Sequence, residues 1–199
     1  LTSPDTVISN TLKTDNKNTF IITGANQGGK STFLRSIGLA QIMMQTGMFV
    51  SAECFSTDIC PQIFTHYKCE EDSHMVSGKL DEELRRMRDI VSELKPDDLV
   101  LFNESFSATN SREGAGIIRG IVTALAERHV KLFFVTHTSE FACAFYQEYH
   151  QDTVYLCAER REDGVRTFHM TEGAPLDTSY GEDLYREVFT PPAHSTESH

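Results

Sequence analysis

The sequence predicts an α/β fold in which a largely parallel central sheet is flanked by helices and carries a small antiparallel hairpin. Three observations predict it. A glycine-rich loop at residues 24–31 joins an apolar run to a helical pattern, two later apolar runs alternate with helical segments, and residues 152–172 have the pattern of a hairpin. In such a sheet the functional site lies at the carboxyl ends of the strands.

The first elements are a buried strand at residues 18–23 and a helix at 30–46, joined by a loop with the spacing G-x-x-x-x-G-K-S. This is the phosphate-binding P-loop, in which glycines let backbone N–H groups approach phosphate oxygens and the helix adds its positive dipole end. Lys30 is expected to reach the β- and γ-phosphates, and the Ser31 hydroxyl to bind Mg²⁺. The alternative is a glycine-rich turn that binds nothing, and the strand before it and the helix after it argue against that. The chain is therefore expected to bind a nucleoside triphosphate.

The next elements alternate between the two patterns. In chain order they are a strand-like piece at 62–65, a charged amphipathic helix at 79–94, a strand at 98–104, a helix at about 111–128 and a buried strand at 131–137. The hairpin pairs residues 152–158 with 165–172, and a short helix is expected near 181–189. The domain is expected to span residues 1–190, and 191–199 to be a disordered polar tail.

Composition sets limits on the class of protein. The chain has 199 residues and 39% hydrophobic residues, enough for one substantial domain, and no apolar stretch approaches the roughly 20 residues of a membrane span. It shows no signal-peptide pattern, so a cytoplasmic location is expected, nucleoid-associated in a bacterium. It opens on Leu1 without an initiator Met, which suggests a piece of a longer protein. Its five cysteines lack a CxxC pair and are expected to be free thiols.

The net charge of −11, from 18 basic and 29 acidic residues, argues against a surface that grips DNA phosphates. The one basic cluster, Arg85-Arg86 with Arg88, is interleaved with acidic residues and has the pattern of a solvated helix face.

Polar residues at two strand ends are the candidates for chemistry. Glu104, at the end of the strand at 98–104, is expected to orient the attacking water of a phosphoryl transfer. Asn103 stands where P-loop enzymes carry a magnesium-associated Asp, so it is expected to hold a metal-bound water without supplying charge. His137 ends the next strand and is expected to approach the γ-phosphate. The alternatives are a solvent-facing carboxylate for Glu104 and a satisfied core residue for His137.

Five ordered motifs resemble the MutS mismatch-repair ATPases. Residues 23–35 resemble that family's P-loop, T-G-x-N-x-G-G-K-S-T, in which Asn26 and the double glycine are unusual among P-loop proteins. The other four are Ile63-Phe64-Thr65 (I-F-T), residues 103–111 with Gly114 (D-E-x-x-x-x-T-x-x-x-x-G), Thr136-His137 with Glu140-Phe141 (T-H-x-x-E-[LF]) and Ser179-Tyr180-Gly181 (S-Y-G). The resemblance covers about residues 7 to 185.

The resemblance implies an ABC-superfamily ATPase that uses ATP and Mg²⁺ and works as a dimer, with itself or a paralogous subunit, each nucleotide lying between two protomers. It also implies an adenine cleft at Val7 and Ile8, closed by Phe168, which by itself has the pattern of a core residue. The nucleotide-binding residues it implies in the loop are Gly24, Ala25, Asn26, Gln27, Gly28, Gly29, Lys30, Ser31 and Thr32.

Two departures from the family pattern matter. The family supplies a serine to the opposite nucleotide from an S-G-x-S-T-F segment, and this chain keeps only Ser77-Gly78 of it, so Ser77 or Lys79 is the candidate for that role. The loss of Ser-Thr-Phe from this segment, together with Asn103 in place of an Asp, indicates a divergent MutS-related branch. The family's mismatch-reading wedge belongs to a domain that this chain does not contain, so DNA would be bound through other domains.

The sequence thus predicts the ATP-hydrolysing domain of a MutS-like DNA mismatch repair or recombination protein, which couples nucleotide state in a dimer to DNA binding. The alternative is a nucleotide-gated dimerisation or clamp module with little or no hydrolysis. An SMC-type or transporter ATPase is disfavoured because no L-S-G-G signature is present.

Overall fold

The computed structural model describes residues 7–14, 16–68, 78–107, 109–161 and 164–176. In this part of the chain the elements are β1 (Thr19–Gly24), α1 (Lys30–Gln45), β2 (Ile63–Tyr67), α2 (Lys79–Glu93), β3 (Leu99–Asn103), α3 (Ser111–Glu127), β4 (Lys131–Val135), α4 (Ser139–Tyr149), β5 (Thr153–Arg160) and β6 (Arg166–Glu172). The strands form one sheet in the order β2-β3-β4-β1-β5-β6. All neighbours are parallel except β5 and β6, which form the antiparallel hairpin. The predicted fold class is confirmed.

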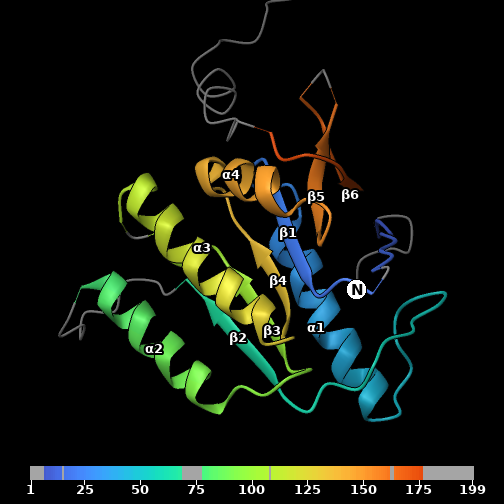
Figure 1. Cartoon of the computed structure of the whole chain (residues 1–199). Helices are drawn as coiled ribbons and strands as arrows, with labels where there is room; N and C mark the ends of the chain where they lie inside the picture. The colour runs from blue at the N-terminus through green and yellow to red at the C-terminus, as the bar shows by residue number, and fades with distance from the viewer. Residues whose placement is uncertain (1–6, 15, 69–77, 108, 162–163, 177–199) are drawn as a thin grey trace, which may run out of the picture.

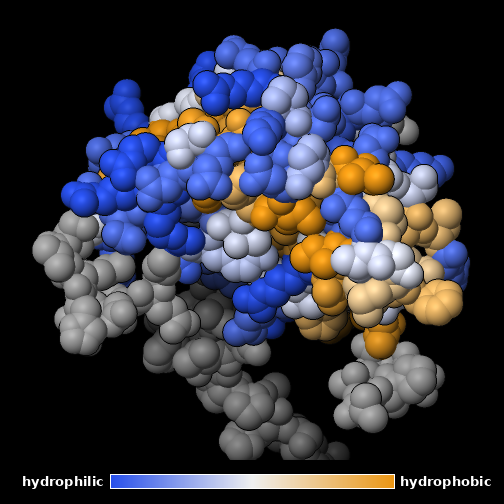
Figure 2. All heavy atoms as spheres, turned by 90° about the horizontal axis from the view of Figure 1, so that it is seen from below, coloured by the Kyte–Doolittle hydropathy of each residue, from blue (hydrophilic) through white to orange (hydrophobic). Residues whose placement is uncertain are grey.

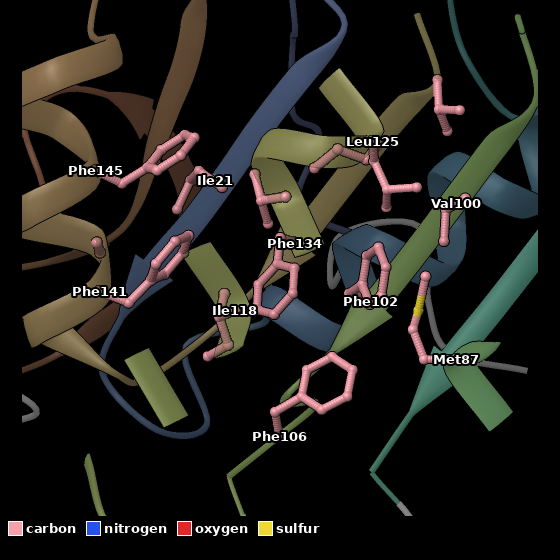
Figure 3. Close-up of a cluster of buried hydrophobic side chains, with 14 of the residues drawn as sticks. Ile21, Met87, Val100, Phe102, Phe106, Ile118, Leu125, Phe134, Phe141 and Phe145 are labelled. Carbon is pink, nitrogen blue, oxygen red and sulfur yellow. The ribbon is translucent and has the colours of Figure 1, made fainter. Parts of the chain in front are cut away.

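Helices cover both faces of the sheet, with α2, α3 and α4 on one face and α1 on the other (Figure 1). The central strands β1, β3 and β4 are buried on both sides, which explains why they are largely continuous apolar runs. On β1, Ile21 joins the cluster under α2, α3 and α4, while Phe20 and Ile22 join the cluster under α1. Figure 3 shows the first cluster, in which Phe102 and Phe134 from adjacent strands stack with ring centroids 4.9 Å apart. These two layers hold the ends of β1, β3 and β4 in fixed register.

Helix α1 lies close against β3 at the middle of the helix. A Cβ added at Gly38 would come within 2.6 Å of a Leu101 methyl carbon, and Leu34, one turn earlier, is fully buried. A larger residue at position 38 would have to displace the Leu101 side chain, so glycine favours this close approach. Helix α1 is therefore packed tightly against β3.

Some element boundaries differ from the predicted ones. The predicted strands at 98–104 and 131–137 end at Asn103 and Val135. Helix α4 was not predicted, because its segment is rich in aromatic residues, which favour strands over helices. The predicted helix near 181–189, the polar tail and the S-Y-G motif lie outside the described residues.

The C-terminal half of α1 and the segment after it expose apolar side chains. Large exposed side chains on the C-terminal half of α1 and the segment after it are Leu39, Ile42, Met48, Phe49 and Ile59. Seen from below, Figure 2 shows orange and tan side chains gathered on the side where this segment lies. In the basic cluster of α2, Arg85 and Arg88 are solvated, with Arg85 paired to the exposed Asp81 at 3.0 Å, whereas Arg86 is partly buried and donates to the carbonyl of Tyr67 at 3.0 Å. Among the described helices, not one has the length and apolar character needed to span a membrane.

Candidate nucleotide site at the carboxyl ends of three strands

The loop between β1 and α1 depends on glycines at three positions. Gly24 and Gly29 have φ angles of 115° and 86°, which side-chain-bearing residues rarely adopt. A Cβ on Gly24 would lie 2.9 Å from the backbone nitrogen of Ala158, and one on Gly28 would lie 2.9 Å from the Ala158 methyl. The loop is therefore wrapped tightly against β5, and its fixed shape suits a backbone cradle for an anion at a helix N-terminus.

Lys30 is enclosed by this loop. Its Nζ donates to the carbonyl oxygens of Gly24 at 2.8 Å and Ala25 at 2.7 Å, and only 4% of the residue is exposed. Burial lowers the pKa of Lys30 from its usual value, while the nearby Glu104 carboxylate raises it in part. The ammonium is therefore a partly desolvated cation within the loop, where it would interact strongly with an anionic phosphate.

Ser31 and Asn103 join α1 to the end of β3. The Ser31 hydroxyl donates to Oδ1 of Asn103 at 2.7 Å. A hydroxyl and an amide oxygen are hard ligands that suit Mg²⁺, but the pair carries no charge. Within the described residues no group of three or more His, Cys, Asp or Glu could hold a metal. The residues therefore fit a magnesium ion held mainly by substrate phosphates and water, as this ion usually is.

Glu104 and His137 lie at the ends of the adjacent strands β3 and β4. Glu104 has a φ of 55°, and its N–H donates to the carbonyl of Val135 at 2.9 Å. Its Oε2 lies 3.9 Å from Nδ1 of His137, and both side chains are partly exposed. His137 is not a core residue, since its side chain is 38% exposed, and the Glu104 carboxylate is partly exposed at its strand end.

The predicted adenine-side residues lie on the other flank of the loop. Asn10 ties the N-terminal segment to β6, accepting from the N–H of Met170 at 2.6 Å and donating to the carbonyl of Phe168 at 3.2 Å. The Phe168 ring lies beside Gly29 and is 45% exposed, so Phe168 is not a core residue. Val7 and Ile8 are also exposed. An accessible aromatic ring next to the loop suits stacking on a base.

The structure places Lys79 as the first residue of α2, and Ser77 lies outside the described residues. Two groups near the loop were not predicted. Arg166 of β6 donates to the side chain of Gln27 at 3.1 Å, and a buried cluster of His66, Glu83 and Ser105 lies behind Glu104. Their members are far apart in the sequence, and the only signal was that His66 directly follows the I-F-T segment.

Comparisons with known proteins agree with this site. Residues 20–195 match the family description MutS domain V. MutS protein homolog 4 of Mus musculus is 32% identical over 189 residues, covering 88% of this chain and 19% of that protein. The DNA mismatch repair protein MutS of Leuconostoc citreum is 30% identical over 183 residues, covering 91% and 21%. Endonuclease MutS2 of Thermus thermophilus is 36% identical over 141 residues, covering 68% and 18%. The chain thus spans about a fifth of the length of these relatives.

Proposed function

The chain belongs to the MutS family, whose domain V it matches over residues 20–195, and we propose that it is the ATP-binding and ATP-hydrolysing domain of a DNA repair or recombination protein. One observation carries the proposal. The P-loop, the Ser31–Asn103 pair and the Glu104–His137 pair meet at the carboxyl ends of β1, β4 and β3, which are neighbours in the sheet. Phosphate binding, metal binding and water activation are the three requirements of triphosphate hydrolysis.

In the proposed reaction the loop from Gly24 to Thr32 holds the triphosphate. Nζ of Lys30 exchanges the carbonyls of Gly24 and Ala25 for phosphate oxygens, which is favourable because an anion is a stronger acceptor than a neutral carbonyl. Ser31 would hold Mg²⁺ directly and Asn103 would hold it through water. When bound, the ion would neutralise charge on the phosphates.

Glu104 orients the attacking water, and His137 senses the γ-phosphate from the neighbouring strand end. Val7, Ile8 and Phe168 bind the adenine on the opposite flank. Ser77 or Lys79 would contact the nucleotide of the second protomer, which is another copy of the chain or a paralogous subunit. Nucleotide state then changes the geometry of the dimer, and the dimer acts on DNA through domains outside this chain.

Substitution of Glu104 by Gln tests the role of the carboxylate. The amide keeps the size of the side chain but cannot act as a base, so hydrolysis is expected to fall by about 100-fold or more while ATP affinity stays unchanged. Phosphate release under single-turnover conditions and titration with a fluorescent ATP analogue measure the two quantities. Phosphate release at the wild-type rate would remove Glu104 from its proposed role.

A nucleotide-gated clamp that barely hydrolyses ATP is the second candidate. The neutral Ser31–Asn103 pair favours it, because a site without a carboxylate at residue 103 binds magnesium more weakly. Steady-state phosphate release, measured with and without a dimer partner, separates the two functions. ATP-dependent association without phosphate release would establish the clamp.

A further inference from the structure

The loop that follows β3 is strained on both sides of Ser105. Glu104 and Phe106 have φ angles of 55° and 61°, in the left-handed region that bulky residues avoid. Such conformations persist only where surrounding contacts enforce them, and they gather at functional sites. The contacts that hold this loop come from β2, β4 and α2.

Glu83 of α2 holds the loop two residues after Glu104. Its Oε2 accepts a hydrogen bond from the N–H of Phe106 at 3.0 Å, and only 3% of Glu83 is exposed. Burial raises the pKa of the Glu83 carboxyl above its usual value. A carboxyl buried on the core side of a helix is costly, and an apolar residue would serve a merely structural helix better.

His66 of β2 fixes the same loop from a second direction. It is fully buried, and its ring stacks on Phe106 with centroids 4.9 Å apart. Its Nε2 lies 2.9 Å from the Glu83 carbonyl, which can only accept, so Nε2 carries the proton. The Ser105 hydroxyl donates to the His66 carbonyl at 2.6 Å, and its oxygen lies 2.7 Å from Nδ1 of the His66 ring.

The backbone around Glu104 is thus clamped at both ends. On one side the N–H of Glu104 is held by the carbonyl of Val135, and on the other the N–H of Phe106 is held by Glu83. The ring of Phe106 is the aromatic anchor of this clamp, and it belongs to the same buried cluster as Phe102 and Phe134 (Figure 3).

Helix α2 connects this clamp to the predicted dimer contact. Lys79 begins the helix, and Glu83 follows it by one helical turn. We propose that Glu83 is a positioning residue, which holds the loop of Glu104 in its strained conformation and couples the start of α2 to that carboxylate. The coupling rests on the proposed function, in which Glu104 orients the attacking water and Ser77 or Lys79 contacts the opposite nucleotide.

Four variants of the chain test this proposal: E83L, E83Q, E93L and E104Q. Leu removes the acceptor, whereas Gln retains a carbonyl oxygen for the N–H of Phe106. Glu93 is an exposed glutamate on the same helix and gives the matched control. E83L is expected to slow single-turnover phosphate release at saturating ATP by about tenfold or more, with ATP affinity within about twofold of wild type. E83Q and E93L are expected to retain the wild-type rate.

A second readout does not depend on hydrolysis. In protein labelled with ¹⁵N-phenylalanine, the amide of Phe106 is expected to exchange with solvent at least about tenfold faster in E83L, and at the wild-type rate in E83Q and E93L. Where E83L unfolds, S105A takes its place, because it removes only the hydroxyl that ties the loop to His66. The same slowing of phosphate release is then expected.

The outcomes distinguish the positioning role of Glu83 from the proposed function of the chain. Wild-type phosphate release in E83L together with an inactive E104Q overturns the positioning role and leaves the proposed function standing. An active E104Q overturns the proposed function itself. Unchanged exchange of the Phe106 amide in E83L shows that the contact does not hold the loop, and this too overturns the inference.

Discussion

The amide of Asn103 determines the charge of the site where the triphosphate and its metal are expected. It lies at the end of β3 and accepts a hydrogen bond from the Ser31 hydroxyl. The hydrogen bond fixes the Ser31–Asn103 pair, but neither side chain contributes negative charge. N103D places a carboxylate at the same position and preserves the hydrogen bond, because a carboxylate oxygen accepts from a hydroxyl at least as well. We expect the magnesium concentration for half-maximal hydrolysis to fall by about three- to tenfold in N103D.

A magnesium titration of phosphate release at fixed ATP measures this change. N103A provides the comparison, since it removes both the charge and the acceptor of Ser31 and should require more magnesium than wild type. An N103D protein that needs the same magnesium as wild type would show that residue 103 does not act on the metal.

Residues near the site differ in how well the sequence predicts them. Ser31, Asn103, Glu104 and His137 could be placed because a strand end and a motif locate each of them without knowledge of its partners. Glu83 could not, because its partner in the loop is Phe106, 23 residues away, and a glutamate in a charged helix normally faces solvent. Pairing across that distance is decided by the packing of α2 against β2 and β3.

At the scale of elements, the buried His66 links β2 to α2 and makes the stability of the fold depend on pH. Burial is the main cause that lowers the pKa of His66 below 6.5, and the charge of Arg86 adds to it. The unfolded chain therefore takes up this proton at a higher pH than the folded chain does. His66 contributes its full stability above about pH 6.5, and this contribution is lost as the pH falls through the folded-state pKa.

Glu83 changes the pH dependence of stability in the opposite direction from His66. Its raised pKa means that the folded chain binds this proton more readily, so its effect on stability becomes more favourable as the pH falls from the folded-state pKa toward 4.5. Comparing wild type with H66Q separates the two groups. Below about pH 6.5, we expect the free energy of unfolding to fall more steeply in wild type than in H66Q, by up to about 1.4 kcal/mol per pH unit. Urea denaturation at a series of pH values measures both curves, and parallel curves would contradict the prediction.

Elements whose sequence pattern matches their secondary structure were predictable, whereas the pattern of α4 does not indicate a helix. The central parallel strands β1, β3 and β4 are buried on both faces, so each is a largely continuous apolar run that the sequence displays directly. Helix α4 buries Phe141, Ala142 and Phe145 and carries further aromatic residues beside them. Its helical state is favoured by packing against α3 and the sheet more than by local propensity, which sequence patterns alone do not reveal.

At the scale of the whole molecule, charge opposes the dimer that the proposed function requires. The chain has a net charge of −11, so two copies repel each other, and each bound triphosphate adds further negative charge. Salt weakens this repulsion, since the distance over which charges act falls from about 30 Å at 0.01 M to about 3 Å at 1 M. Contacts made at close range through the nucleotide are screened less.

We therefore expect E104Q, which should retain ATP, to form a dimer in the presence of ATP and Mg²⁺. The dimer should be tighter at 0.5 M than at 0.05 M salt, because the higher salt concentration screens the repulsion between the two acidic chains. K30A lacks the cation held by the P-loop and should remain monomeric at both salt concentrations, which makes it the control for the nucleotide. Sedimentation velocity over a range of protein concentrations measures the association. A dimer that forms without ATP, or that weakens as salt rises, would mean that a surface other than the nucleotide site holds the two copies together. An E104Q chain that binds ATP but stays monomeric at both salt concentrations would instead confine the proposed dimer to partners or domains beyond this chain.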